Sequence, residues 1–359
     1  MILEIRQIHY IIMNIPFTVL GRQRIRVTSA ILHIFIAGII VATGTGWGPA
    51  AKAATTASSE PPHGLMIQVS SLAPSISPTQ LKSMLEKVRA KHRISLASPG
   101  YINSVVLQDI ADQNGKLLTT YLDVIKPYLP GGKTPAFTTA YVGTVDLAWT
   151  GTGSKYIEGI ASSTFRNKNV ALSNTAAKAF SVRYPTLKYN WYITYEANLG
   201  AFWNDAVKNN YTAYINQLAA SLSTVKSGKT FMWSPAFWTN YAAMPAWALP
   251  SLQLNIKDAS SKITMPFILN LQDFVGQSSG ATTREDAVVW MNYLKTNWKA
   301  ARTTHQINVE QFVQSSTGAI TAANPAEIAA RSNYYAQQGL TLGPTWEIRF
   351  WYQRLYVSQ

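Results

Sequence analysis

The chain has 359 residues, of which 47% are hydrophobic and 11% aromatic, so it can bury a large core and is not predicted to be disordered. It contains no cysteine, which excludes a disulfide framework, a thiolate nucleophile and a cysteine-based zinc site. The formal net charge of +14 favours anionic partners.

The first 53 residues have the features of an export signal. A basic stretch at residues 22–26 precedes an apolar run at residues 30–42, and Ala51-Lys52-Ala53 then has the small-x-small pattern of a cleavage site. The apolar run is shorter than a bilayer span, although a retained N-terminal anchor is the alternative. We therefore expect a secreted or extracytoplasmic protein, cleaved near Ala53, with no stable membrane insertion after signal removal.

The chain stays basic without this segment. Residues 1–53 hold five basic residues and one acidic residue, so their removal lowers the net charge from +14 to +10. The remaining lysines and arginines are scattered, and they form neither a basic block nor a base-reading motif. An anionic cell-envelope surface is therefore a candidate partner, and no nucleic-acid partner is expected.

Residues 54–63 read as a polar linker, and regular alternation of strand-like and helix-like segments begins at Gly64. Eight apolar, β-rich segments are predicted as strands: Leu65–Val69, Val105–Leu107, Phe137–Val142, Asn190–Tyr195, Thr230–Trp233, Thr264–Leu271, Ile307–Val309 and Leu340–Arg349. Helices are predicted between them at Pro78–His92, Leu117–Tyr128, Asn169–Tyr184, Asn209–Val225, Trp247–Leu254, Arg284–Trp298 and Pro325–Gln338.

This alternation predicts an α/β fold. Strands joined by helices pair in parallel through right-handed crossovers, and eight such units close into a (β/α)8 TIM barrel. An open, doubly wound sheet is the alternative, but residues 68–77, after the first strand, read QVSSLAPSIS and lack a glycine-rich dinucleotide fingerprint. We therefore expect one barrel domain over residues 64–359.

Three of the predicted strands are followed directly by an acidic residue. The segments WYITYE, FILNLQD and INVE end at Glu196, Asp273 and Glu310. Each carboxylate could cap the next helix or pair with an arginine, but their shared position predicts a common site, because barrel active sites lie at the carboxyl ends of the strands.

Two carboxylic acids that face each other across a cleft can cleave a glycosidic bond. One protonates the leaving oxygen, and the other attacks the anomeric carbon or activates water. We expect Glu196 to be the proton donor and Glu310 the nucleophile, with Asp273 orienting one of them or binding a sugar hydroxyl. The sequence does not decide between retention and inversion, which depend on the distance between the two carboxyl groups.

Aromatic residues near two strands support a sugar ligand. Trp233 and Trp238 lie in and after the fifth strand, and Trp346 lies in the eighth. Indole rings offer flat apolar faces for stacking on pyranose rings, although packing between the barrel and its helices is the alternative for each of them.

Other chemistries have less support. His63, His92 and His305 show no paired metal-ligand spacing, so no metal is expected, and no cofactor motif is recognised. No GxSxG elbow occurs, and GTGSKY at residues 151–156 lacks the spacing of a phosphate-binding loop, which favours a flexible loop there.

Four motifs resemble a known family. WYITYE (191–196), MWSPAFW (232–238), LNLQDFVG (269–276) and INVEQF (307–312) are similar to segments of the bacterial domain-of-unknown-function family 4434, whose members look like glycoside-hydrolase TIM barrels. The chain departs from that pattern twice: Phe274 stands where the family usually has glycine, and Ala236 separates Ser234-Pro235 from the aromatic residue that follows.

The resemblance covers most of residues 64–350 and implies a site that includes Glu196, Ser234, Gln272, Asp273 and Glu310. The complete set of expected substrate-binding residues is Tyr195, Trp233, Ser234, Trp238, Gln272 and Trp346.

The leading hypothesis is a secreted glycoside hydrolase that acts on a polysaccharide or cell-envelope glycan by a two-carboxylate, retaining mechanism. The alternative is a barrel that binds carbohydrate, or associates with the cell wall, without catalysis. Full activity of both Glu196→Gln and Glu310→Gln would argue against the leading hypothesis.

Overall fold

The computed structural model describes residues 63–94, 102–237, 241–277 and 282–352. The predicted export signal, most of the predicted linker and Trp238 lie outside the described residues. The export signal and the linker therefore stay predictions.

The core of the protein is an eight-stranded parallel sheet with the strand order β10-β1-β2-β3-β4-β5-β6-β7. Its strands are β1 (His63–Gln68), β2 (Ile102–Asp109), β3 (Thr139–Val142), β4 (Asn190–Ile193), β5 (Phe231–Trp233), β6 (Phe267–Gln272), β7 (Thr303–Asn308) and β10 (Pro344–Trp346). Neighbours in the sheet are neighbours in the chain, except that β10 pairs with β1.

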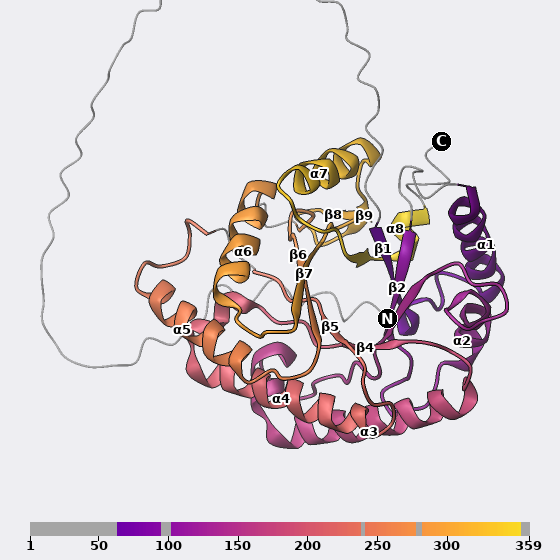
Figure 1. The fold of residues 1–359 in the computed structure, drawn as a ribbon, viewed down its shortest axis with the longest axis horizontal. Coiled ribbons are helices and arrows are strands. Elements are labelled where there is room, and N and C mark those ends of the chain that lie inside the picture. Colours follow the sequence, from indigo (N-terminus) through magenta and orange to yellow (C-terminus); the bar gives the residue numbers. More distant parts are fainter. Residues whose placement is uncertain (1–62, 95–101, 238–240, 278–281, 353–359) are drawn as a thin grey trace, which may run out of the picture. The chain divides into compact units, whose positions relative to one another are not determined.

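The ring closes between β7 and β10 through a short contact. The Ile307 amide donates to the carbonyl of Thr341 at 2.9 Å, and the Gly343 amide donates to the carbonyl of Ile307 at 2.8 Å. Helices pack around the sheet (Figure 1). The predicted TIM-barrel fold class is therefore confirmed as a nearly closed eight-stranded barrel with interleaved helices.

The longer helices connect successive strands of the barrel. They are α1 (Pro78–Ile94), α2 (Thr119–Ile125), α3 (Ser163–Arg183), α4 (Asp205–Ser223), α5 (Ala248–Ser261), α6 (Arg284–Asn297) and α7 (Pro325–Gln337). Side chains fix several of their starts: Asn204 and Asn324 cap α4 and α7, and Thr283 forms a capping box with Asp286 on α6. No helix in the described part of the chain is both long and apolar enough to cross a membrane.

Several elements differ in extent from the sequence-based expectation: helix α3 begins six residues before its predicted start at Asn169, and strand β7 begins four residues before Ile307. The predicted strand Leu340–Arg349 is short, because the amides of Phe350 and Trp351 donate to the carbonyl of Glu347 and start helix α8 (Ile348–Tyr352). Helix α5 is longer than its predicted segment. A hairpin of β8 (Phe312–Gln314) and β9 (Ile320–Ala322) follows β7 and was not predicted.

Side chains on the two faces of the sheet have different surroundings. Outward residues pack with the helices in one large core, whereas six inward residues form a second cluster: Met66, Val106, Tyr141, Tyr192, Met232 and Ile268. Two residues further along several strands, the inward positions become polar: Gln108, Thr194, Ser234, Asn270 and Asn308. The barrel interior is therefore apolar in the middle of its strands and polar towards their carboxyl ends.

Candidate active site

Glu196 continues the inward row of β4 beyond Tyr192 and Thr194 and is partly exposed. The amide of Gln108 donates to Glu196 Oε1 at 3.3 Å, and the Tyr211 hydroxyl donates to the Glu196 backbone carbonyl at 2.9 Å. Burial raises the pKa of Glu196 to about 7, against the opposing effects of a hydrogen bond from Gln272 and the positive charge of Lys155. This carboxyl group can therefore hold or release a proton near neutral pH.

Lys155 and Asp146 form an ion pair whose charges both act on Glu196. Lys155 Nζ lies 2.9 Å from both Asp146 carboxylate oxygens and 5.6 Å from the ring centre of Tyr195, the residue before Glu196. Lys155 belongs to the GTGSKY segment, for which we expected a flexible loop. The structure instead shows a turn of π-helix at Lys155–Gly159, capped by Ser154. Nothing in the sequence pattern linked this lysine to the site.

Glu310 follows β7 and is 2% exposed. Its Oε2 accepts from the Gly276 amide at 2.7 Å, and its Oε1 accepts from the Gln277 side chain at 3.0 Å. Burial and the neighbouring Asp273 carboxylate raise the pKa of Glu310, while the two hydrogen bonds and Arg331 oppose that rise. Both carboxylate oxygens are thus oriented by donors from the segment after β6.

Asp273 is fully enclosed and does not face a cleft. It pairs with Arg331 at 3.1 Å, accepts from the Tyr335 hydroxyl at 3.0 Å and accepts from the Glu310 amide at 3.2 Å. Arg331 also donates to the Glu310 carbonyl. Asp273 therefore holds the backbone of Glu310 in place, and the predicted contact between Asp273 and a sugar hydroxyl does not fit this arrangement.

Gln272 and Ser234 belong to the polar part of the barrel interior, at the carboxyl ends of the strands. The Gln272 amide donates to the carbonyl of Ser234 at 2.6 Å, and Asn270 donates to the Ser234 hydroxyl at 3.0 Å. Gln272 is partly exposed and also bonds to Glu196, whereas Ser234 is buried beneath it. Residues 272 and 273 thus connect to the two glutamates, one to each.

Phe274 has a φ of 57°, in the left-handed region that favours glycine. The next residues donate to Glu310, so this turn sets the position of its hydrogen-bond donors. Phe274 thus adopts a backbone conformation that glycine usually occupies.

Tyr195 and Trp233 do not lie in the site. Both are fully buried and point to the helix side of the sheet, where they pack among other aromatic rings. The Trp233 indole donates to the carbonyl of Tyr195 at 2.6 Å. Both residues therefore pack between the barrel and its helices, which was the alternative to sugar binding. Successive strand residues alternate between the two faces of the sheet, and these two lie on the outer face.

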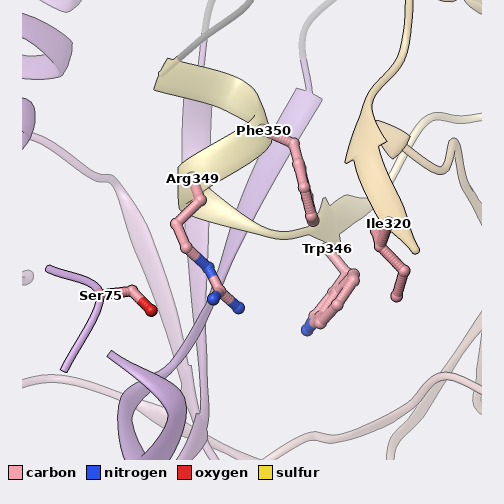
Figure 2. A pocket seen from close by; sticks show the side chains of 5 residues that line it. All are labelled: Ser75, Ile320, Trp346, Arg349 and Phe350. Carbon is pink, nitrogen blue, oxygen red and sulfur yellow. The ribbon is translucent and has the colours of Figure 1, made fainter. Parts of the chain in front are cut away.

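Trp346 is partly exposed at the end of β10 and lines an open hollow of about 360 Å³. The other lining residues are Ser75, Ile320, Arg349 and Phe350 (Figure 2). The ring of Trp346 lies 5.3 Å from that of Phe312, which is two residues after Glu310. The hollow therefore lies at the carboxyl ends of the strands, beside the segment that carries Glu310.

The remaining strand-end carboxylates are held by protein groups. Asp109 accepts from the amide and hydroxyl of Ser70, and burial raises its pKa to about 6. Glu347 is fully buried and pairs with Arg349 at 2.6 Å. In the described ranges, no group of three or more His, Asp or Glu side chains is arranged to hold a metal ion.

The strand order and the interleaved helices define the chain as a TIM barrel, and two solved TIM-barrel structures are similar to it. A "putative alpha-L-fucosidase" of Bacteroides thetaiotaomicron matches with a TM-score of 0.52 and 11% identity, over 81% of this chain and 86% of that one. A GH18 chitinase from Cycas revoluta, in complex with allosamidin, matches with a TM-score of 0.43 and 9% identity, over 80% and 95% of the two chains.

No protein-family model matches the chain. No significant match is found among curated proteins. At such low identities the structural similarity shows the fold alone, and the resemblance to domain-of-unknown-function family 4434 stays an expectation.

Proposed function

We propose that this protein is a glycoside hydrolase in which Glu196 donates a proton to the leaving oxygen. The observation that carries the proposal is the environment of Glu196: the carboxyl group is at the end of a barrel strand, partly exposed, and its pKa is raised to about 7. An acid that stays protonated near neutral pH can act as a general acid there.

Glu310 is the second carboxylate of the proposed mechanism. The Gly276 amide and the Gln277 side chain fix its two oxygens, and Arg331 and Asp273 fix its backbone. This support holds the carboxylate in one orientation, as attack on an anomeric carbon requires. We propose Glu310 as the nucleophile of a retaining reaction, with Asp273 as a positioning residue. Burial and the Asp273 carboxylate raise the pKa of Glu310 to about 8, above that of Glu196, so this role requires Glu310 to lose its proton when substrate binds.

The proposed substrate is a carbohydrate polymer, and the proposed location is outside the cytoplasm. The ring of Trp346 is available for stacking in the hollow beside the Glu310 segment. Export is inferred from the N-terminal sequence pattern. A polymer of the cell envelope fits both features.

The test is the activity of Glu196→Gln and Glu310→Gln on a panel of plant, fungal and bacterial polysaccharides. We expect each substitution to reduce product formation by at least about 100-fold, because each removes a group that transfers a proton or forms a bond. Glu285→Gln, at an exposed carboxylate on α6, is the matched control and should keep full activity. Wild-type turnover that survives in both site variants would refute the mechanism.

A second candidate function is carbohydrate binding without turnover. The specific observation in its favour is that protein donors already occupy both oxygens of Glu310, which is 2% exposed. In that case the wild-type protein would bind polysaccharides from the panel and release no product from them.

A further inference from the structure

The hollow beside Trp346 combines an aromatic ring with a guanidinium group. Ser75 comes from the loop after β1, Ile320 from the hairpin after β7, and Trp346, Arg349 and Phe350 from the end of β10 and α8. Figure 2 shows the head of Arg349 directed towards the space that Ser75 and Trp346 also border. The hollow is thus lined by the loop after β1, the β8–β9 hairpin, and the end of β10 with helix α8.

Arg349 keeps free hydrogen-bonding capacity towards this hollow. Its Nε donates to Glu347 at 2.6 Å, and its Nη2 reaches the Ser71 hydroxyl only at 3.4 Å. A guanidinium carries five N–H donors, so the edge formed by Nη1 and Nη2 retains donors after these two contacts. Its side chain is 28% exposed.

The pairing with Glu347 fixes this edge. Glu347 is fully buried and bonds to both the Nε and the backbone amide of Arg349. A guanidinium held on one side by a buried carboxylate presents its other edge in a constant direction. A planar pair of N–H donors matches the two oxygens of a carboxylate, and the indole of Trp346 offers a flat apolar face beside it.

We propose that this hollow is a subsite for an acidic sugar, in which Arg349 binds the carboxylate of a uronic acid residue and Trp346 stacks on its ring. This inference rests on the proposed function, and it narrows the substrate class to glycans that carry carboxylates. Because the rings of Trp346 and Phe312 are in contact and Phe312 closely follows Glu310, the subsite lies next to the proposed nucleophile.

The experiment measures binding without turnover, in the Glu196→Gln background. The probes are polygalacturonate, alginate, hyaluronan and glucuronan, each compared with its carboxyl-reduced form, which keeps the backbone and the linkage but loses the charge. We expect at least one acidic polymer to bind roughly tenfold or more tightly than its reduced form. Absence of this preference for all four polymers overturns the proposal.

The second step separates a specific contact from general attraction to a basic protein. Arg349→Gln combined with Glu347→Gln removes both members of the ion pair, so neither charge is left buried and unpaired. Arg302→Gln is the matched control, since Arg302 is exposed at the opposite end of the barrel, just before β7. The preference should disappear in the double variant and persist in Arg302→Gln; an equal loss in both overturns the proposal.

Arg349→Lys covers the case in which the double variant does not fold. Lysine keeps the charge and can pair with Glu347, but it lacks the two-atom edge, so we expect the preference for the acidic polymer to fall several-fold. An unchanged preference in a folded Arg349→Lys protein overturns the proposal.

The result can also be separated from the proposed function. If binding depends on Arg349 but the wild-type protein forms no product from any polysaccharide, the subsite is supported and the hydrolase activity is refuted. If product forms from neutral glycans alone and Arg349→Lys does not change it, the hydrolase activity is supported and the subsite is refuted.

Discussion

At Glu196, a single carboxyl group links the site to the stability of the fold. Below about pH 4.5, the ordinary pKa of a glutamate side chain, the group is protonated in both the folded and the unfolded chain. Between that value and about 7 the folded protein keeps a proton that the unfolded chain loses, so the stability contributed by this group falls as the pH rises through the window.

The free energy of unfolding of Glu196→Gln should therefore rise relative to that of the wild-type protein as the pH increases. We expect a relative gain of roughly 1 to 3 kcal/mol in the free energy of unfolding between pH 4.5 and pH 7.5, because glutamine never has to bury a charge. Urea unfolding of both proteins at a series of pH values measures it. A difference that does not vary with pH would contradict the raised pKa.

The buried ion pair between Asp273 and Arg331 leads to a second prediction. Arg331→Met should lower the free energy of unfolding by about 3 to 5 kcal/mol, because it leaves the enclosed Asp273 carboxylate without its counter-charge. Arg284→Met, which breaks an exposed pair with Glu285, should cost less than about 1 kcal/mol. Chemical denaturation compares the two, and similar costs would show that burial does not distinguish these pairs.

The sequence predicts some of these residues well and others not at all. Glu196 and Glu310 follow recognisable strand segments, so strand alternation places both at the carboxyl ends of the barrel. Lys155 and Arg331 act on carboxylates distant in the chain, and Arg349 lies in helix α8, where a strand was predicted; no local periodicity marks them. Trp233 was misplaced because its ring, although next to the site in sequence, belongs to the other face of β5.

Among the elements, the β8–β9 hairpin and the turn after β6 form one unit around Glu310. The Gln314 amide donates to the Gly276 carbonyl at 2.7 Å, while the Gly276 amide donates to Glu310. A Cβ at Gly276 would lie 2.2 Å from the Phe312 carbonyl oxygen and 3.0 Å from Glu310 Oε2. Only glycine allows this close approach of the two segments.

Gly276→Ala should therefore push the turn away from the hairpin and disturb the orientation of Glu310. We expect at least about a tenfold loss of activity, because a displacement of about 1 Å can cost 100-fold in rate. Gly228→Ala is the control, since Gly228 lies just before β5, at the opposite end of the barrel, and an added Cβ there would meet no atom within 4 Å. Circular dichroism should show that both variants keep their secondary structure; equal activity of the two would contradict this role for the turn.

The elements themselves differ in how far local sequence predicts them. All eight barrel strands were predicted at their places, because each is a short β-rich run between helical segments. The hairpin was missed because each of its strands has only three residues, too few to show a period-two pattern. Its apolar residues Val313 and Ile320 are exposed, so they do not mark a buried face either. The end of the last strand was misjudged because helix α8 continues the same apolar run, and periodicity alone does not separate the two.

For the whole molecule, the prediction concerns its passage out of the cytoplasm. Expression in a bacterial host should yield an extracytoplasmic protein whose N-terminus is Ala54, as the Ala51-Lys52-Ala53 pattern implies. Mass spectrometry of the extracytoplasmic fraction measures the mature terminus. Recovery of the full-length chain in the membrane fraction would instead support the retained anchor.

The pairing of β1 with β10 has a consequence for the time course of folding. Thr345 donates to the carbonyl of Gly64 across 281 residues, so the first strand gains its second neighbour only when the last strand has been made. Pairings between residues so far apart in the chain form late and slow folding. If the chain is exported with its N-terminus first, as proposed, the barrel would stay open until its last strand has crossed the membrane.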